Sequence, residues 1–440
     1  MQKYQMLSGL VGFNMKNIHE RLKRFILTDG FAHVADLKKS HGSWFVDANT
    51  GKEYLDCYSL HASQPLGWNH PKLNEHKKRL ADIVLHNLSN SDLYSDPYAT
   101  FVDTFAAIAP DFKHFFFISG GTLGVENALK AAFDWKAQKL GWDDYHDDAA
   151  EQLDVIHLNE AFHGRSGYTL SLTNTGVVKT KWYPKFPWTR ILNPKITPEL
   201  DTQTMEAFSL YQAKKALETN KVAAIILETI QGEGGDNHFR PEYFQALREL
   251  ANRYEAMLIL DEVQTGVGLT GEMWAYKHYR IIPDMICFGK KTQVCGFCST
   301  ERIDEVPNNV FTVSGRINST WGGNLVDMVR ATAYFNIIQQ DNLVNNARVV
   351  GNYFLQQLRK LPLSNVRGRG LMVAFDLPTS EDRDKFLKKL NEKVFCLKCG
   401  EKSIRFRPHL TFSKDEVDVV VNHLKNCLSS FKYAPKKDDD

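Results

Sequence analysis

Apolar runs of strand length recur between residues 113 and 297, and segments with a helical pattern lie between them. The runs read HFFFI, DVIHL, VAAIILE, AMLILDEV and DMICFGK. Near-continuous apolar strands that alternate with helices are typical of a parallel sheet covered by helices on both faces. The sequence therefore predicts an α/β fold with a mainly parallel sheet.

The end of the chain has a different pattern, with a long helical segment followed by short strands around GLMVAFDL and SIRFRPHLTF. This pattern favours a smaller α+β domain. We expect an N-terminal segment that joins the small domain (1–75), a large α/β domain (76–330) and the small domain itself (331–440). The last residues, PKKDDD, are expected to form a solvated end.

Two ionisable residues stand where neighbouring strands are predicted to end. Asp261 ends the run MLILD, and Lys290 follows the run MICFG after one crossover of ordinary length. Both side chains should therefore project into the same crevice. They could form a buried ion pair, but such pairs contribute little to stability. A cofactor with an aldehyde and a protonated ring nitrogen would use both groups, with Lys290 as its Schiff base and Asp261 at the nitrogen. Pyridoxal phosphate is such a cofactor.

The segment SGGT can hold the phosphate of this cofactor. Ser119, Gly120, Gly121 and Thr122 leave a predicted strand and begin a helix, so free backbone N–H groups and the helix dipole would face an anion. A glycine-rich turn of this kind often only turns the chain. Because this turn, Asp261 and Lys290 all follow the carboxyl ends of predicted strands, a phosphate site is the better interpretation.

Three other residues follow the ends of predicted strands. Phe162 could stack on a pyridine ring or pack in the core, while Val263 could pack on the opposite ring face. The amide of Gln264 could hydrogen-bond the phenolic oxygen of the ring.

Composition narrows the classes of partner and compartment. The 440 residues carry a net charge of +2, which gives no reason to expect a nucleic acid or a membrane as partner. No apolar run approaches the roughly 18 residues of a membrane-spanning helix, and the first 22 residues do not resemble a signal peptide. Seven cysteines suggest a reducing, cytoplasmic location. The pairs Cys295/Cys298 and Cys396/Cys399 are too far apart for a shared zinc ion, so no metal site is expected.

The motifs LILDEVQTG, FGKKTQVCG, AFHGRSGYTLSLTNT, QGEGGDNHFRPE and NSTWGGN resemble those of the class III, fold-type I aminotransferases. Within that family the stronger resemblance is to enzymes that transfer the ε-amino group of L-lysine to 2-oxoglutarate. It covers roughly residues 115–325, with RGRGLMVAFDLP and RFRPHLTF extending it. The segment HASQPLGWNHP departs from the pattern, so the resemblance does not assign the residues at the rim of the pocket.

The resemblance implies a role for each matching residue. Lys290, the first lysine of the pair, would carry the cofactor, while Lys291 would either lower the proton affinity of Lys290 or be structural. Gly121 and Thr122 would bind the phosphate, Phe162 would stack on the ring, and Gln264 would contact the ring oxygen and the substrate. Thr320 would reach the phosphate of the neighbouring subunit, which requires a homodimer, and Asn318 would contact the substrate.

The same resemblance implies how one pocket accepts two substrates. Arg165 would hold the α-carboxylate of lysine and later the distal carboxylate of 2-oxoglutarate, whose near carboxylate would bind Arg405. Glu233 would pair Arg405 while lysine is bound and move away for 2-oxoglutarate. Without the resemblance, these charges read as surface and loop residues. The alternatives are transamination of ornithine or 4-aminobutyrate, an aminomutase, and a non-catalytic protein that binds the cofactor.

Overall fold

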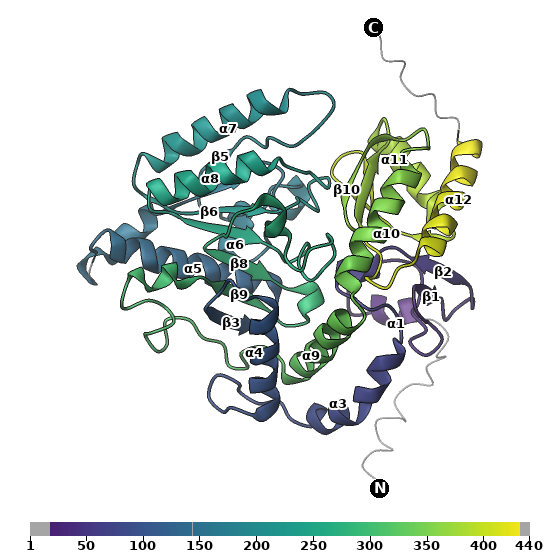
Figure 1. Ribbon diagram of the computed structural model, residues 1–440, viewed down its shortest axis with the longest axis horizontal. Helices are drawn as coiled ribbons and strands as arrows, with labels where there is room; N and C mark the ends of the chain where they lie inside the picture. The colour runs from purple at the N-terminus through teal and green to yellow at the C-terminus, as the bar shows by residue number, and fades with distance from the viewer. Residues whose placement is uncertain (1–17, 143, 432–440) are drawn as a thin grey trace.

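The computed structural model describes residues 18–142 and 144–431. The expectations for the first 17 residues and for the PKKDDD end lie outside these ranges. The described chain forms a large sheet with its helices and a smaller part built from both early and late segments of the chain, and the two lie side by side (Figure 1). None of the helices in the described ranges is long and apolar enough to cross a membrane.

The large sheet has seven strands in the order β3-β9-β8-β7-β6-β4-β5. Its strands are β3 (His114–Ile118), β4 (Asp154–Leu158), β5 (Arg190–Ile191), β6 (Val222–Glu228), β7 (Met257–Asp261), β8 (Met285–Phe288) and β9 (Cys295–Ser299). Strands β5, β4, β6, β7 and β8 are joined by parallel ladders, which confirms the predicted sheet.

Strand β9 was not predicted, because the polar run after Lys290 and the glycine at position 296 are typical of a turn. It runs antiparallel between β3 and β8, with Gly296 opposite both Phe117 and Phe288. A Cβ atom on Gly296 would lie 1.9 Å from the carbonyl oxygen of Phe116. Only glycine fits this close approach, so the residue that suggested a turn is required inside a strand.

Both faces of the large sheet are buried, in two separate apolar clusters. In β6, Ala224 and Ile226 pack in the cluster that contains Val125 and Leu129 of α5, whereas Ile225 and Leu227 belong to the main core. This alternation follows from the two-residue period of a strand. The helices of this part are α4 (Asp96–Ile108), α5 (Gly121–Lys139), α6 (Gly167–Leu172), α7 (Thr202–Leu217) and α8 (Pro241–Arg253).

The crossover between β7 and β8 differs from the prediction. The segment EMWAYKHYR was expected to be helical, but it contains only a short 3₁₀ helix, Ala275–Tyr279. Both carboxylate oxygens of Glu262 accept hydrogen bonds from the backbone of Ala275 and Tyr276. Trp274, Tyr276 and Tyr279 are all buried, whereas Lys277 and Arg280 are exposed, and the bonds to Glu262 hold the backbone in place of a longer helix.

Two smaller sheets complete the fold. One has the order β10-β11-β14-β13 and the other β1-β2-β12, in which β12 pairs parallel to β2. Their strands are β1 (Trp44–Val46), β2 (Glu53–Asp56), β10 (Ser364–Arg369), β11 (Met372–Asp376), β12 (Val394–Phe395), β13 (Leu397–Cys399) and β14 (Ser403–Phe406). Residues near both ends of the chain therefore share one sheet.

Besides the four-residue segment α2 (Ser59–Ala62), the other α-helices are α1 (Ile18–Lys23), α3 (Lys77–Val84), α9 (Leu325–Gln340), α10 (Leu343–Leu358), α11 (Ser380–Leu390) and α12 (Lys414–Ser430). The expected boundary after residue 330 falls inside α9, which packs on both α4 and α10. The division into domains stays a prediction.

Candidate active site

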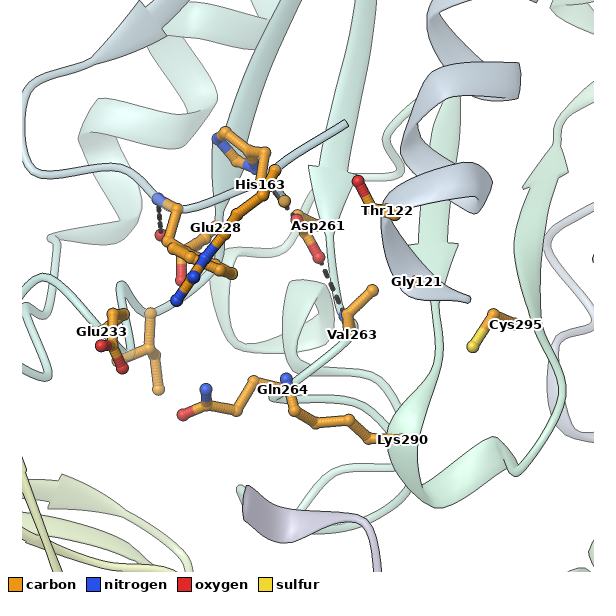
Figure 2. A pocket seen from close by; sticks show the side chains of 14 residues that line it. Gly121, Thr122, His163, Glu228, Glu233, Asp261, Val263, Gln264, Lys290 and Cys295 are labelled. Atoms are coloured by element: carbon orange, nitrogen blue, oxygen red, sulfur yellow. Dashed lines mark hydrogen bonds and ion pairs between the residues drawn. The ribbon is translucent and has the colours of Figure 1, made fainter. Parts of the chain in front are cut away.

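A pocket opens beyond the carboxyl ends of the parallel strands, where the sequence predicted it. Figure 2 shows Asp261, His163 and Glu228 gathered in this pocket, with Lys290 reaching in from the end of β8. The residues that line it are Gly121, Thr122, Phe162, His163, Gly164, Arg165, Glu228, Ile230, Glu233, Asp261, Val263, Gln264, Lys290 and Cys295. Nine residues assigned from the sequence are among them: Gly121, Thr122, Phe162, Arg165, Glu233, Asp261, Val263, Gln264 and Lys290.

Asp261 is held by two contacts at the end of β7. Its Oδ1 atom accepts a hydrogen bond from the backbone N–H of Val263 at 3.0 Å, and its Oδ2 atom lies 2.9 Å from Nδ1 of His163. Both side chains are buried. His163 was not among the predicted site residues, although it follows Phe162 directly in the motif AFHGR.

Glu228 ends β6 beside Asp261 and was also missed. Its two carboxylate oxygens accept hydrogen bonds from the backbone N–H groups of Phe162 and Gly232, both at 3.0 Å. Burial raises the pKa of Glu228 to about 7, and the negative charge of Asp261 acts in the same direction. Glu228 thus fixes the loop that carries Phe162 while remaining easy to protonate.

Lys290 has an unusual backbone conformation and an altered proton affinity. Its φ of 54° lies in the left-handed region, which a residue with a side chain adopts only when its surroundings require it. Burial lowers the pKa of Lys290, and the positive charge of Arg405 lowers it further, against the opposing effect of Asp261. In a larger fraction of the protein molecules, Lys290 is therefore a neutral, nucleophilic amine.

Lys291 is buried and contacts the backbone of two neighbouring segments. Its Nζ atom donates hydrogen bonds to the carbonyl oxygens of Gln264, at 2.7 Å, and Ala62, at 3.2 Å. Burial holds its pKa well below the usual value, with the charge of Lys290 as the next cause. Of the two readings left open by the sequence, these contacts favour the structural one.

The predicted phosphate cradle forms the first turn of α5. Helix α5 begins at Gly121, and a Cβ atom there would lie 3.2 Å from Cγ1 of Val263, so the backbone and Val263 approach closely. The hydroxyl of Thr122 contacts those of Ser166, at 2.8 Å, and Thr169, at 2.7 Å. A 19-residue helix that begins at the pocket directs its free N–H groups and its dipole toward an anion.

Gln264 is oriented by Arg407, which the sequence analysis did not identify. The guanidinium of Arg407 donates two hydrogen bonds to Oε1 of Gln264, at 3.1 and 3.0 Å, and also pairs with the buried carboxylate of Asp236. With its oxygen occupied, Gln264 presents its Nε2 donor to the pocket, as a contact to a phenolic oxygen would require.

The predicted gate residues are in contact. Oε2 of Glu233 accepts a hydrogen bond from Nη2 of Arg405 at 2.9 Å, and Oε1 accepts one from Lys179 at 2.7 Å. Arg405 is only 3% exposed, yet its Nε and Nη1 atoms have no partner among the described residues. Burial alone would raise the pKa of Glu233, but Arg405 and Lys179 together lower it to about 2. Arg165 lies exposed at the pocket mouth.

Asn318 and Thr320 do not line this pocket. Both lie exposed in the loop before α9, where the carbonyl oxygen of Thr320 accepts a hydrogen bond from the hydroxyl of Ser91 at 3.3 Å. Their roles stay predictions, since the resemblance assigns Thr320 to the site of a second subunit.

The segment that departs from the family pattern, residues 61–71, begins inside a left-handed turn formed by residues 59–62. Ser59, Leu60, His61 and Ala62 have φ values of 40°, 53°, 58° and 63°. Left-handed backbone costs about 1–2 kcal/mol per residue, so this turn must be held by its surroundings. The hydroxyl of Ser59 donates to the carbonyl oxygen of Arg407 at 2.5 Å, and Lys291 binds the oxygen of Ala62 at the other end.

The Cys295/Cys298 and Cys396/Cys399 pairs have separate places in the fold. Cys295 faces the pocket from β9, while Cys298, Cys396 and Cys399 are buried. All seven cysteines are free thiols. Within the described ranges, no three His, Cys, Asp or Glu side chains are grouped as they would be around a metal ion.

Comparison with known proteins agrees with this geometry. The aminotransferase class-III family model matches residues 29–428. An L-lysine-epsilon aminotransferase of Amycolatopsis lactamdurans is 46% identical over 439 residues, which cover 95% of this chain and 97% of that protein. A 4-aminobutyrate aminotransferase of Dictyostelium discoideum is more distant, at 29% identity over 95% of this chain and 89% of its own length.

A solved structure with the same fold is described as the lysine aminotransferase from M. tuberculosis in the internal aldimine form. It is 47% identical, has a TM-score of 0.90, and the match covers 94% of this chain and 98% of the solved one.

Proposed function

Because the chain belongs to the class III aminotransferases, we propose that it transfers the ε-amino group of L-lysine to 2-oxoglutarate, giving 2-aminoadipate 6-semialdehyde and L-glutamate. The transaminase activity and the pyridoxal phosphate cofactor predicted from the sequence are confirmed by this membership. The choice of lysine and 2-oxoglutarate is the part that we propose.

The pocket fits the cofactor. Lys290 would bind its aldehyde, Asp261 its ring nitrogen, and the first turn of α5 its phosphate, while Phe162 and Val263 would cover the two ring faces. Pyridoxal phosphate supplies an aldehyde that takes up an amine and a ring that accepts electrons when a proton leaves the neighbouring carbon. His163 would hold Asp261 in the orientation that the ring nitrogen needs.

Lys290 would also move the proton. Once the substrate amine has replaced it at the aldehyde, its free amine would be the base that removes a proton from the ε-carbon of lysine and then the acid that delivers this proton to the cofactor carbon that bore the aldehyde. The lowered pKa of Lys290 supports this role, because a neutral amine is required to accept the proton.

The observation that carries the choice of substrates is the state of Arg405. This buried guanidinium uses one N–H group for Glu233 and has two nitrogens without partners among the described residues, a geometry suited to a carboxylate. While Glu233 is paired to it, the positive charge is offset and an incoming ammonium can approach. When Glu233 leaves, Arg405 can bind 2-oxoglutarate, with Arg165 at the far end.

A homodimer would complete the site. Thr320 and Asn318 are exposed and absent from the pocket of their own chain, as expected if they serve a neighbouring subunit. The exposed apolar side chains include Leu93, Tyr94, Val177, Val178 and Trp182, and a subunit interface would remove such surface from water. The seven free thiols support a reducing, cytoplasmic location.

Ornithine or 4-aminobutyrate as amino donor is the alternative within the family. An aminomutase would need no keto acid, and a non-catalytic protein would have no use for the paired Lys290 and Asp261. Lysine labelled with heavy nitrogen only at its ε position distinguishes these possibilities when the enzyme is supplied with 2-oxoglutarate. Labelled glutamate, measured by mass spectrometry, is the expected result. Unlabelled new glutamate would mean transfer of the α-amino group, and no glutamate would favour another donor or the aminomutase.

A further inference from the structure

Glu233 is held by two cations, of which only Arg405 was predicted from the sequence. The carboxylate lies between them, with Oε1 2.7 Å from Nζ of Lys179 and Oε2 2.9 Å from Nη2 of Arg405. The backbone of Glu233 is fixed independently, because its carbonyl oxygen accepts a hydrogen bond from the N–H of Gly400 at 2.9 Å. A change in the pairing of Glu233 therefore requires only a movement of its side chain.

Lys179 has anchors of its own at the pocket mouth. It ends the short 3₁₀ helix Val177–Lys179, and its Nζ atom also donates to the hydroxyl of Thr175 at 3.0 Å. The same ammonium lies 5.2 Å from the centre of the Phe162 ring, within the range of a cation–π contact. Lys179 can therefore remain in place when the carboxylate of Glu233 turns away from Arg405.

We propose that Lys179 is a positioning residue that retains the Glu233 carboxylate whenever a substrate carboxylate occupies Arg405. This inference rests on the proposed function, in which 2-oxoglutarate must displace Glu233. An expelled carboxylate without a partner would lose its charge-assisted bonds near the incoming dianion. With Lys179 present, the carboxylate oxygen released by Arg405 can turn to the Lys179 ammonium, so this ion pair strengthens while the other is lost, and opening the gate costs less free energy.

The consequence concerns the class of ligand. A ligand with two carboxylates must take Arg405 from Glu233, whereas a ligand with one carboxylate can bind Arg165 and leave the Glu233–Arg405 pair intact. Lys179 thus favours dicarboxylates over monocarboxylates of the same length, without touching either of them.

Calorimetric titration of the cofactor-loaded protein with glutarate and with pentanoate tests this without turnover. In Lys179→Met we expect the Kd of glutarate to rise about tenfold, the usual size of one lost charge-assisted hydrogen bond, and that of pentanoate to stay within about twofold. Lys179→Arg keeps the charge and should bind glutarate nearly as the unmodified protein does.

The decisive control is to repeat the Lys179 substitution in the Glu233→Gln variant, because Lys179 and Glu233 are expected to act as a unit. There, adding Lys179→Met should leave the Kd of glutarate unchanged. An equal loss of affinity with and without Glu233 would mean that Lys179 contacts the ligand directly and would overturn the proposal, as would an unaltered glutarate Kd in Lys179→Met alone. Unmodified protein that binds glutarate no better than pentanoate would instead contradict the proposed acceptor, and the gate with it.

Discussion

Nδ1 of His163 lies 2.9 Å from Oδ2 of Asp261, and both side chains are buried at the base of the pocket. This contact fixes the orientation of the Asp261 carboxylate, so that the carboxylate can bind a ring nitrogen. Replacing His163 with Phe keeps an aromatic ring, slightly larger than the imidazole, and removes the hydrogen bond. We expect the affinity for pyridoxal phosphate to fall about tenfold, since hydrogen bonds to charged groups contribute about 1.5–3 kcal/mol.

Fluorescence titration of the cofactor-free protein measures this change. Asp261→Ala is the matched comparison and should weaken cofactor binding more strongly, because it removes the group that contacts the ring. Equal affinity in His163→Phe and the unmodified protein would show that Asp261 is held well enough by Val263 alone.

The two adjacent lysines should respond differently to substitution. Lys290→Ala should abolish turnover and covalent attachment of the cofactor, because Lys290 faces the pocket. Lys291→Met should lower the unfolding temperature, because it removes two buried hydrogen bonds to Gln264 and Ala62, but leave the attachment in place. Borohydride reduction followed by peptide sequencing in a mass spectrometer locates the attached group. A label on Lys291 would reverse the assignment.

The raised pKa of Glu228 predicts a pH dependence of stability. The folded protein binds the proton of Glu228 with a pKa of about 7, compared with 4.5 in the reference state. Between these values the unfolded chain binds fewer protons, so the free energy of unfolding should fall as the pH rises from about 4.5 to 7, by at most about 3 kcal/mol.

Urea unfolding of cofactor-free protein at several pH values should reveal this trend. The Glu228→Gln variant should lack that part of the slope. Glu262, whose pKa burial also raises to about 7, is present in both proteins, and its contribution cancels. Parallel pH profiles of the two proteins would argue against a protonated Glu228.

Combining Lys290→Ala, which should be inactive, with Thr320→Ala, which should be impaired, is expected to restore activity if Thr320 serves the neighbouring subunit. Lys290→Ala destroys the site of its own chain, and Thr320→Ala weakens the site of its partner. In a mixed dimer, one site has an intact Lys290 and an intact Thr320 from the other chain. Random mixing should therefore recover at most about a quarter of the normal activity, because half of the dimers are mixed and each has one good site of two.

The measurement is activity at limiting cofactor after the two variants are denatured and refolded together, with each variant refolded alone as control. No recovery in the mixture, while each variant still forms dimers, would place Thr320 outside the partner's site.

The parts of the fold that follow from local patterns were predictable. The strand ends at Asp261 and Lys290 are marked by apolar runs, and a parallel crossover of ordinary length places them side by side. The antiparallel strand β9 was not predictable in this way, because Gly296 is needed for close contact with Phe116 and this contact depends on the assembled sheet. The 3₁₀ helix Ala275–Tyr279 was misread for a similar reason, since its aromatic residues are buried on all sides.

The same distinction applies to the site. Glycine-rich turns and charged strand ends carry their own signal, whereas His163, Lys179 and Arg407 act on residues distant in sequence. Nothing near Lys179 in the chain indicates that it contacts Glu233, and nothing near Arg407 indicates that it orients Gln264. Such partners become visible only when the strands and loops are placed in space.

The order of the site residues along the chain has a consequence for synthesis. The cofactor half, from Gly121 to Lys290, lies within the strands and crossovers of the large sheet, whereas Arg405 and Arg407 come from β14 and the residues that follow it. The left-handed turn Ser59–Ala62 is held by a hydrogen bond to the backbone of Arg407. This early segment can therefore take its final form only after the segment that contains Arg407 has emerged from the ribosome. A nascent chain could thus present a formed cofactor cradle while it still lacks the residues that select a substrate.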